Sequence, residues 1–335
     1  MCKKTKIKEI INESSVIMDN IMVSISCTTY NHEDYIADAL ESFLMQKTKY
    51  KYEILIHDDA STDRTADIIK YYEKKYPEII KPIYQTYNQY SKGVKVGKFN
   101  RGRAKGKYIA ICEGDDFWTD ANKLQKQVDY MELHPDCSMC VHATYKVNVE
   151  KVKYRKHVRP NIGNKIYSVE EVIDGGGGLF ATNSIMYPRY LGINMPDFYN
   201  NAPIGDYPLA IYLALQGKVY YIDEFMSAYR IMSKGSWSEK MKEAPAEKRI
   251  DHINKIEDML IGVDEYSDYK YTTVIKKHIQ ENRFNLMLKL GKFSEIKTGQ
   301  FKEHYSSLDL KSKMKIFVKQ YFPNAVKLFR TIKRT

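Results

Sequence analysis

Residues 107–123 read KYIAICEGDDFWTDANK, and this stretch decides the predicted fold class. Its first part, Tyr108–Cys112, is a short apolar run of the kind that forms a strand buried on both faces of a parallel sheet. The run ends at Glu113-Gly114-Asp115-Asp116, which places three acids at the carboxyl end of a strand, where open α/β sheets bind ligands. Clustered carboxylates repel one another unless a divalent cation or strong donors hold them, so a metal–diphosphate site is one interpretation. An acidic turn that caps the next helix is the alternative.

The composition is that of an ordinary globular protein with an excess of positive charge. Of the 335 residues, 43% are hydrophobic and 28% are charged, which allows a sizeable core. The net charge of +11 indicates an anionic partner, whether nucleotide, acidic glycan, nucleic acid or anionic membrane surface. The five cysteines lie mostly in apolar runs, so we expect buried free thiols in a reducing compartment. No window approaches the ~20 apolar residues of a membrane span, and we expect a cytoplasmic protein.

Two strand–turn–helix patterns precede the acidic stretch. Ile21–Cys27 is strand-like and ends in the polar turn Thr28-Thr29-Tyr30-Asn31, and Tyr52–His57 runs into a turn that starts with Asp58-Asp59. Each turn is followed by apolar residues at helical spacing, and a further strand is expected at Ile80–Tyr84. Parallel strands joined in this way share one binding edge, so the repetition predicts an α/β fold.

Three segments, in this order and spacing, resemble the family-2 inverting glycosyltransferases of the GT-A fold. They are VSISCTTYNHEDYIADALESFLMQ at 23–46, EILIHDDASTDRTADII at 53–69 and GKYIAICEGDDFWTD at 106–120. The likeness is greatest to bacterial enzymes that build capsule, O-antigen and other cell-surface glycans. It implies a GT-A catalytic domain over residues 20–238, with a nucleotide-sugar half at 20–120 and an acceptor half at 121–238.

The resemblance implies donor-binding roles at the first two turns. Thr28, Tyr30 and Asn31 match positions that hold the nucleotide base and ribose in the family. Asp59 resembles the carboxylate that accepts a hydrogen bond from the ring N–H of uracil. The implied donor is therefore a nucleotide-sugar, and a UDP-linked one in particular.

The acidic stretch resembles the family's DXD region, which usually holds Mn²⁺ or Mg²⁺ on the diphosphate of the donor. The resemblance implies that Asp115 and Asp116 bind the metal. It also implies that Glu113 and Asp115 contact the donor, with Glu113 standing where the family has its first Asp. A sugar that leaves as a nucleoside diphosphate builds up negative charge on the β-phosphate, and a hard cation offsets this charge.

Weaker patterns predict the elements of the second half. Ser138–Ala143 is expected to be a strand, because it is short, apolar and follows a predicted helix. Ser168 and Glu171 have the spacing of a capping box, which predicts the start of a short helix. Thr182–Tyr187 is expected to be a strand that lines the same pocket.

Asp206 opens the next predicted helix, which ends at Gly217. It resembles the family's catalytic base, a carboxylate that takes the proton from the acceptor hydroxyl while that oxygen attacks the anomeric carbon. An inverting displacement needs one such base on the face opposite the leaving group. The alternative is a residue that only caps the helix. His57 and His142 are other candidate bases, but each lies in a strand-like run and is expected to be a core or edge histidine.

Arg230 is the candidate for a positive charge near the donor phosphates. The segment 228–233, AYRIMS, matches one that reads Tyr-Arg-Val-His in many relatives, with Met232 at the position of the histidine. Arg230 or Lys234 is therefore expected to supply positive charge in place of that histidine. The loop Ser233–Glu239 is expected to close over bound donor as a lid.

Residues 239–335 are predicted to form a helical C-terminal region with a basic amphipathic tail. No acid follows Asp309, whereas eight Lys or Arg residues do, and Met314, Phe317 and Tyr321 have helical spacing. This composition suits a helix on an anionic membrane surface, with the protein peripheral on the inner face of the plasma membrane. Packing on the protein's own surface, or against a second copy in a homodimer, is the alternative.

The favoured hypothesis is a metal-dependent inverting glycosyltransferase that acts on a glycan or lipid-linked glycan precursor, with no nucleic-acid partner. A sugar nucleotidyltransferase is one alternative, but it needs a Gly-rich basic loop after the first strand, where this chain has Thr28-Thr29-Tyr30-Asn31. A non-catalytic nucleic-acid-binding protein is another. It predicts interleaved basic and aromatic residues around a site without acids, whereas this chain places acids at strand ends.

Overall fold

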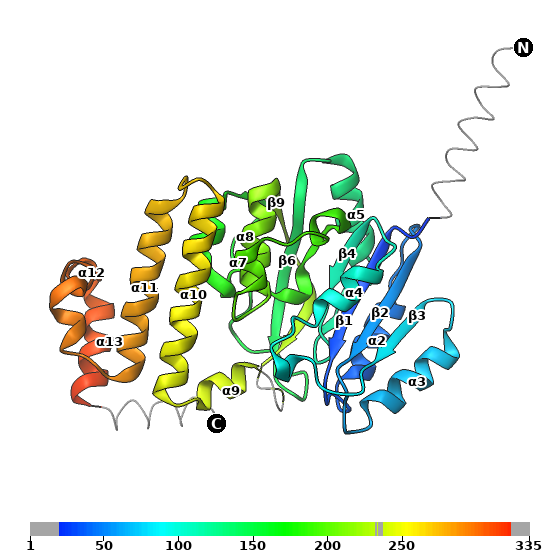
Figure 1. The fold of residues 1–335 in the computed structure, drawn as a ribbon, viewed down its shortest axis with the longest axis horizontal. Coiled ribbons are helices and arrows are strands. Elements are labelled where there is room, and N and C mark those ends of the chain that lie inside the picture. The colour runs from blue at the N-terminus through cyan, green and yellow to red at the C-terminus, as the bar shows by residue number, and fades with distance from the viewer. Residues whose placement is uncertain (1–19, 232, 234–236, 323–335) are drawn as a thin grey trace, which may run out of the picture. The chain divides into compact units, whose positions relative to one another are not determined.

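The computed structural model describes residues 20–231, 233 and 237–322, and the chain divides into two compact units, Met1–Lys242 and Glu243–Thr335. The first unit contains a β-sheet covered by helices, and the second is helical (Figure 1). The predicted α/β fold with a helical C-terminal region is therefore confirmed.

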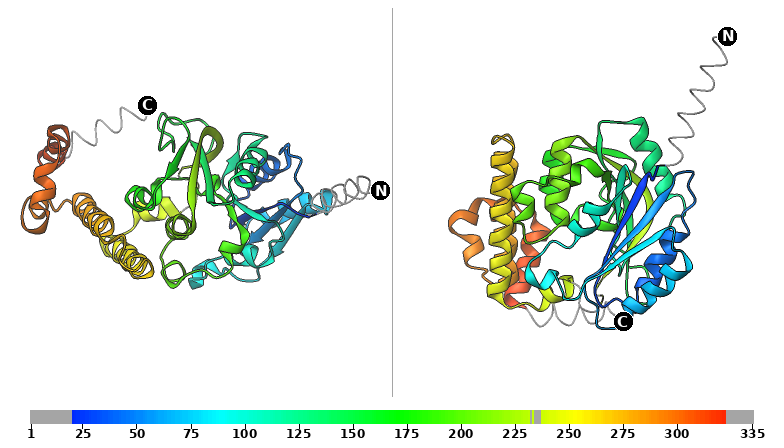
Figure 2. Two further views of the ribbon diagram at one scale, coloured as in Figure 1. Left: turned by 90° about the horizontal axis from the view of Figure 1, so that it is seen from above. Right: turned by 45° about the vertical axis from the view of Figure 1, so that its right-hand side comes forward.

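Four parallel strands form the first half of the sheet, in the spatial order β3-β2-β1-β4. Their bounds are β1 (Val23–Thr29), β2 (Tyr52–Asp58), β3 (Ile80–Tyr84) and β4 (Tyr108–Ile111). Because all four run in the same direction, their carboxyl ends lie at one edge, as the repeated pattern predicts. The right-hand view of Figure 2 shows β1 and β2 in blue, side by side.

The second half of the sheet is mixed. Its strands are β5 (Phe117–Trp118), β6 (Cys137–Val147), β7 (Lys165–Tyr167), β8 (Met186–Pro188) and β9 (Lys218–Arg230). Within the described residues, the whole sheet has the order β3-β2-β1-β4-β8-β6-β9-β5, with β7 also paired to β9. β5 follows the acidic turn and pairs with the end of β9, Phe117 lying opposite Ala228. This pairing brings Arg230 next to the turn.

Helices cover the sheet through apolar residues at helical spacing. Those of the first unit are α2 (Ile36–Leu44), α3 (Thr65–Lys75), α4 (Gly97–Arg103), α5 (Lys123–Leu133), α6 (Val169–Gly175), α7 (Asp197–Asn200) and α8 (Asp206–Gln216), with α9 (Trp237–Glu243) at its end. Ile36, Leu40 and Phe43 of α2 are fully buried in a core shared with β1, α3 and α5. α4 lies over β1 and β2 (Figure 1), where Asn100 Nδ2 donates to the carbonyls of Cys27 and Leu55.

Four of the five cysteines lie within the described residues, and all four are buried and free, as predicted. They are Cys27, Cys112, Cys137 and Cys140. Burial raises the pKa of each thiol, to about 11 for Cys137. These thiols therefore stay protonated and inert at neutral pH. Cys2 lies outside the described residues.

The prediction of a strand at Thr182–Tyr187 is wrong for most of that segment. Thr182–Ser184 forms a single 3₁₀ turn, and β8 starts only at Met186. Ser184 Oγ donates to the carbonyl of Ala181 at 2.7 Å, so its side chain stabilises a turn in place of strand pairing. The capping box at the start of α6 is confirmed, because Ser168 and Glu171 exchange both expected hydrogen bonds.

The second unit contains α10 (Ala246–Tyr266), α11 (Thr272–Leu290), α12 (Lys302–Ser307) and α13 (Leu310–Tyr321). α10 and α11 pack together, joined by an ion pair in which Arg283 contacts Glu257 through two hydrogen bonds. A small core formed by Phe284, Ile296, Phe301 and Ile316 connects α11 with α13. Among the described residues, no helix is both long and apolar enough to cross a bilayer.

Candidate active site

The three polar turns predicted from the sequence meet at the carboxyl edge of the parallel strands. The register of β1 and β2 sets Thr29 beside Asp58. The backbone N–H of Gly114 donates to the carbonyl of Thr28 at 2.9 Å, and the N–H of Asp59 donates to that of Thr29 at 3.0 Å. These links hold the turns after β2 and β4 against the end of β1. The side chains expected to bind the donor from these turns therefore share one edge of the sheet.

Asp59 is buried, and both of its carboxylate oxygens accept backbone hydrogen bonds. Oδ1 accepts from the N–H of Gln89 at 2.8 Å, and Oδ2 accepts from that of Tyr90 at 2.9 Å. The carboxylate thus fixes the loop after β3, a function that the sequence does not reveal. Each carboxylate oxygen has a second lone pair, so contact with a nucleobase N–H is compatible with these bonds.

Asn31 joins the first turn to the second. Its Oδ1 accepts from the N–H of Thr62 at 2.8 Å, and its own N–H donates to Ser61 Oγ at 2.9 Å. Its backbone φ of 55° lies in the left-handed region, which Asn tolerates better than most residues. At the same edge Thr28 is partly exposed and Tyr30 is exposed, so these two side chains are accessible to a ligand.

The two acids expected to bind metal have different surroundings. Asp116 is fully buried, and its Oδ1 accepts from the N–H of Arg230 at 2.8 Å while its Oδ2 accepts from Asn183 Nδ2 at 2.9 Å. Asp115 is partly exposed, and its Oδ2 accepts from Ser233 Oγ at 2.7 Å. A buried carboxylate needs internal donors of this kind, so Asp116 anchors the turn. Only Asp115 of the expected pair is accessible, which differs from the expectation that both bind metal.

The carboxyl group of Glu113 lies within range of the charges of Asp115 and Asp206. Burial raises the pKa of Glu113 to about 8, and the charges of Asp115 and Asp206 add to the rise. Burial also raises the pKa of Asp206. Carboxylate oxygens are the donors that Mg²⁺ and Mn²⁺ prefer, and a cation between Glu113 and Asp115 would relieve the repulsion. The residues at this edge therefore fit a divalent cation.

Gly114 lets the acidic turn pass close to the end of β1. A Cβ at this position would lie 2.6 Å from Thr29 Oγ1, which is too close for atoms in a packed interior, and 3.1 Å from His32 Nδ1, which is a tight contact. Both of these polar atoms are buried and make no hydrogen bond with any described residue. Neither the position of His32 nor the reason for a glycine here is apparent from the sequence. Unused hydrogen-bonding capacity thus lies directly against the turn that carries Glu113 and Asp115.

Asp206 is the first residue of α8, and its carboxylate is held by the start of that helix. Its Oδ1 accepts from the N–H of Tyr207 at 2.8 Å, and the Thr182 side chain hydrogen-bonds the same carboxylate. Asp206 is partly exposed and lines a recess together with Gly176 and Gly177. Asp206 therefore lies beside the glycine run at the start of α8.

Lys95 supports the loop that leads to Asp206, a role that the sequence does not indicate. Its Nζ donates to the carbonyls of Ala202 at 3.0 Å and Ile204 at 2.7 Å. Burial lowers the pKa of Lys95 to about 8, and the nearby charge of Arg101 lowers it further, while Asp206 opposes the shift. Lys95 gives little signal in the sequence because it is one of several lysines in an irregular segment.

Arg230 lies inside the protein, in a position that differs from the expected contact with donor phosphates. Its side chain is 1% exposed, its guanidinium pairs with the carboxylate of Asp38 in α2, and Nη1 donates to the carbonyl of Asp115. The guanidinium also lies over the rings of Tyr35 and Phe117, 4.8 Å and 5.0 Å from their centroids. Arg230 therefore clamps the acidic turn to α2.

The loop that follows Arg230 is described only in part. Ser233 is described and contacts Asp115, as stated above. Met232, at the family's histidine position, and Lys234, the alternative cation, lie outside the described residues, as do 235 and 236. The predicted closure of this loop over the donor stays a prediction.

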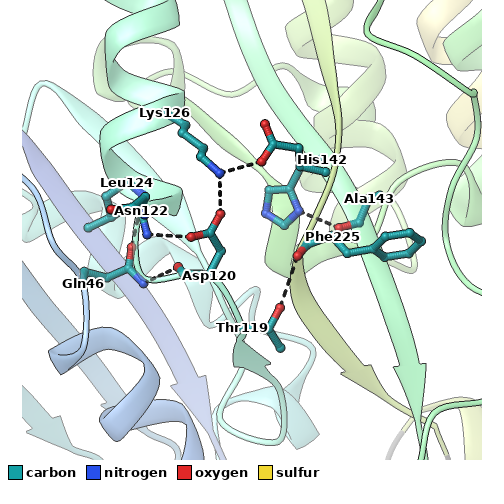
Figure 3. A network of polar contacts seen from close by, with 10 residues as sticks. Gln46, Thr119, Asp120, Asn122, Leu124, Lys126, His142, Ala143 and Phe225 are labelled. Atoms are coloured by element: carbon teal, nitrogen blue, oxygen red, sulfur yellow. Dashed lines mark hydrogen bonds and ion pairs between the residues drawn. The ribbon is translucent and has the colours of Figure 1, made fainter.

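A second polar network supports the segment after the acidic turn (Figure 3). Lys126 Nζ contacts the carboxylates of Asp120 at 2.6 Å and Glu224 at 2.5 Å. The carbonyl of Asp120 accepts from Gln46 Nε2 at 2.9 Å. The connection between β5 and α5 is thus tied to the residues after α2 and to β9. These contacts hold the segment that follows the acidic turn and β5.

The two histidines considered as alternative bases are buried in the core. His142 Nδ1 lies 2.9 Å from the carbonyl of Ala143 (Figure 3), and His57 stacks on Phe99 with ring centroids 4.8 Å apart. Burial lowers the pKa of both imidazoles. Neither side chain is exposed at the edge that carries the carboxylates.

A family model and several curated relatives match parts of this chain. Residues 24–189 match the model of glycosyl transferase family 2. The chain is 35% identical over 220 residues to the uncharacterized protein Rv1520 of Mycobacterium tuberculosis, a match that covers 64% of this chain and 60% of that protein. It is 40% identical over 113 residues to WfaP of Escherichia coli, a UDP-Glc:alpha-D-GlcNAc-diphosphoundecaprenol beta-1,3-glucosyltransferase, covering 33% of this chain and 41% of WfaP. The chain thus spans about 60% or less of the length of these relatives.

Solved structures share the fold. Residues 1–349 of TarS from S. aureus, in complex with UDP-GlcNAc, match with a TM-score of 0.58 at 15% identity, over 88% of this chain and 78% of that one. The mannosyltransferase PcManGT of Pyrobaculum calidifontis, in complex with GDP-Man and Mn²⁺, matches with a TM-score of 0.56 at 12% identity, over 92% and 83%. Identities this low show the fold alone. Together with the family match, they confirm the resemblance seen in the sequence, and the chain belongs to glycosyltransferase family 2, with the GT-A fold.

Proposed function

We propose that this protein is an inverting glycosyltransferase that moves a sugar from a UDP-linked donor to a hydroxyl of a glycan or lipid-linked glycan precursor in cell-surface polysaccharide synthesis. The observation that carries the proposal is that Glu113 of the acidic turn lies within range of the charges of Asp115 and Asp206. Burial raises the pKa of Glu113, and these two charges add to the rise. The names of relatives support the donor and the acceptor class, because WfaP uses UDP-Glc and a diphosphoundecaprenol-linked sugar. TarS is solved with UDP-GlcNAc.

The nucleotide is proposed to bind at the ends of β1 and β2. Tyr30 is exposed there and offers a ring for stacking on the base, while Thr28 offers a hydroxyl to the ribose. Asp59 is already oriented by the loop N–H groups of Gln89 and Tyr90. Its remaining lone pairs accept the ring N–H of uracil, which favours a pyrimidine donor.

Asp115, with Glu113 beside it, would hold Mn²⁺ or Mg²⁺ at the donor diphosphate. Bound there, the cation supplies positive charge to the β-phosphate as the nucleoside diphosphate leaves. Asp116 and Arg230 do not touch the donor in this proposal. They fix the backbone of the turn through the bonds of Asp116 to Asn183 and to the N–H of Arg230, so that Asp115 keeps its orientation.

Asp206 is proposed as the base that removes the proton from the acceptor hydroxyl. The N–H of Tyr207 and the Thr182 side chain orient its carboxylate, and burial raises its pKa, which strengthens it as a proton acceptor. The oxygen of the acceptor then attacks the anomeric carbon directly, the bond to the diphosphate breaks, and no covalent intermediate forms on the enzyme.

The test is Asp206→Asn in the purified protein. We expect turnover to fall roughly 10²–10⁴-fold, because the amide cannot accept the proton, while the affinity for the nucleotide stays near that of wild type. Transfer is measured with a panel of nucleotide-sugars and affinity by titration calorimetry. Loss of donor binding in this variant, or an unchanged rate, would show that Asp206 is not the base.

A further inference from the structure

α13 presents two faces with different environments. On the inner face Ile316 is buried in the small core with Phe284, Ile296 and Phe301. Asp309 caps the start of the helix by accepting from the N–H of Ser312 at 2.6 Å. Near the other end Lys297 Nζ donates to Gln320 Oε1 at 2.7 Å. α13 is therefore a firmly anchored part of the second unit.

The outer face of α13 carries an exposed apolar stripe, which we define as Leu310, Met314, Phe317 and Tyr321. These side chains are 78%, 53%, 45% and 57% exposed. Their spacing of i, i+4, i+7 and i+11 places them on one line along an α-helix. The rings of Phe317 and Tyr321 lie 4.7 Å apart, so the stripe is continuous at this end. Large side chains gathered in this way on a surface usually mark a contact with a partner or a membrane.

Lysines flank the stripe on both sides. At 100° per residue, Lys313 falls 60° to one side of Leu310, and Lys311 and Lys315 fall 100° and 140° to the other. Lys311 and Lys315 are exposed. No acid lies on α13 or in the sequence that follows it to residue 335, where four more Lys or Arg residues occur. The helix that carries the apolar stripe therefore bears charges of one sign, and Asp309 at its start is the acid next to the stripe.

We propose that the stripe of α13 binds the surface of an anionic lipid bilayer, with its apolar side chains at the boundary of headgroups and acyl chains and its lysines at the lipid phosphates. Amphipathic helices with this division of residues bind in the plane of the bilayer surface. Charge complementarity favours an anionic bilayer over two other occupants of the stripe, a second copy of the protein and the C-terminal residues of the same chain. A second copy of the stripe, or the basic residues 323–335 of the same chain, would bring like charges together.

The test is cosedimentation of the full-length protein with vesicles of phosphatidylcholine that contain about one third phosphatidylglycerol, beside vesicles of phosphatidylcholine alone. We expect binding to the anionic vesicles and release as salt rises, because ions screen the lysine–phosphate attraction. Leu310→Ser/Met314→Ser should weaken binding about tenfold or more, through the loss of apolar surface. Lys311→Glu/Lys315→Glu should weaken it by a similar factor at low salt.

Matched controls separate the stripe from general effects. Lys276→Glu/Lys289→Glu makes the same change in net charge at two exposed positions of α11, and Leu133→Ser/Ile162→Ser removes two exposed apolar side chains of the first unit. Both control variants should bind vesicles like wild type. Helix content by circular dichroism confirms that each variant is folded. Truncation after Asp309 is avoided, because it would remove Ile316 from the small core.

Three results would overturn the proposal. The first is wild-type binding that is equal for neutral and anionic vesicles or absent from both. The second is a stripe variant that binds as well as its control. The third is a wild-type dimer that the stripe variants convert to monomer, measured by analytical ultracentrifugation, without any vesicle binding. That last result would assign the stripe to contact between two copies.

Discussion

Replacing Arg230 by Ala should destabilise the first unit substantially, because this side chain joins three elements from the inside. The substitution leaves Asp38 without its main partner and the carbonyl of Asp115 without a donor. Removing one partner of a buried ion pair costs about 3–5 kcal/mol. Asp38 is partly exposed and keeps a 2.6 Å contact with Lys151, so the low end of that range, about 3 kcal/mol, applies.

For a unit of this size, a loss of about 3 kcal/mol lowers the melting temperature by about 6–12 °C. Differential scanning fluorimetry measures this change, and a nucleotide titration in the presence of Mn²⁺ measures the effect on the site. Arg230→Lys should recover part of the stability, since an ammonium reaches Asp38 but does not match both guanidinium contacts. Lys151→Ala is the control, and it removes only the exposed partner of Asp38, which costs about 0.5 kcal/mol or less.

A specific pair of results would contradict the role of Arg230 as a buried clamp. An Arg230→Ala variant with the melting temperature of wild type, but with greatly weakened nucleotide binding, would mean that the guanidinium contacts the donor. That outcome would restore the role implied by the sequence resemblance. A large loss of stability that Arg230→Lys partly restores would support the clamp between α2 and the acidic turn.

Other predictions concern the acidic turn and the buried core. Asp115→Asn should abolish Mn²⁺-dependent donor binding with little loss of stability, as excess EDTA should for wild type. Asp116→Asn should instead lower the free energy of unfolding by about 1–3 kcal/mol, because an amide N–H₂ would face the donor groups of Asn183 or Arg230. If both variants only weakened donor binding, and by the same factor, the separate roles of Asp115 and Asp116 would be contradicted. Burial lowers the pKa of Lys123 in the folded protein to about 7, whereas its pKa in the unfolded chain is 10.5. Between these two pH values Lys123 carries a proton only in the unfolded chain, so the free energy of unfolding rises with pH. In Lys123→Met the free energy of unfolding, measured by urea titration, should rise less steeply with pH, by about 1.4 kcal/mol per pH unit. The same pH dependence in the variant and in wild type would argue against this prediction.

The sequence predicted those parts of the structure that depend on local patterns. Tyr52–His57 was expected as a strand and β2 ends one residue later, because a run of apolar residues before an acidic turn fits only a few local structures. The capping box of Ser168 and Glu171 was also predictable, since both partners lie within one helical turn. The meeting of the acidic turns at one edge followed from parallel strand direction.

Long-range polar contacts were not predictable in this way. Asp116 is hydrogen-bonded to Asn183, which is 67 residues away in the sequence, and Arg230 is bonded to Asp38, which is 192 residues away. No periodicity of the sequence indicates such partners. The sequence predicts a strand over Thr182–Tyr187, a segment that includes the polar side chains of Asn183 and Ser184. In the structure they are buried and bonded, and the segment forms a turn. The role of Lys95 was not predictable for the same reason, because its hydrogen-bond partners are backbone carbonyls, which no sequence pattern indicates.

The central claim is tested most directly by following the anomeric proton while the protein slowly hydrolyses an α-linked UDP-sugar with Mn²⁺ present and no acceptor. Proton NMR resolves the first sugar anomer formed before mutarotation mixes the two. The account predicts UDP and a β-anomer, because water takes the place of the acceptor opposite the leaving diphosphate. Formation of the α-anomer first would contradict direct inversion, and release of UMP with a sugar phosphate would contradict glycosyl transfer itself.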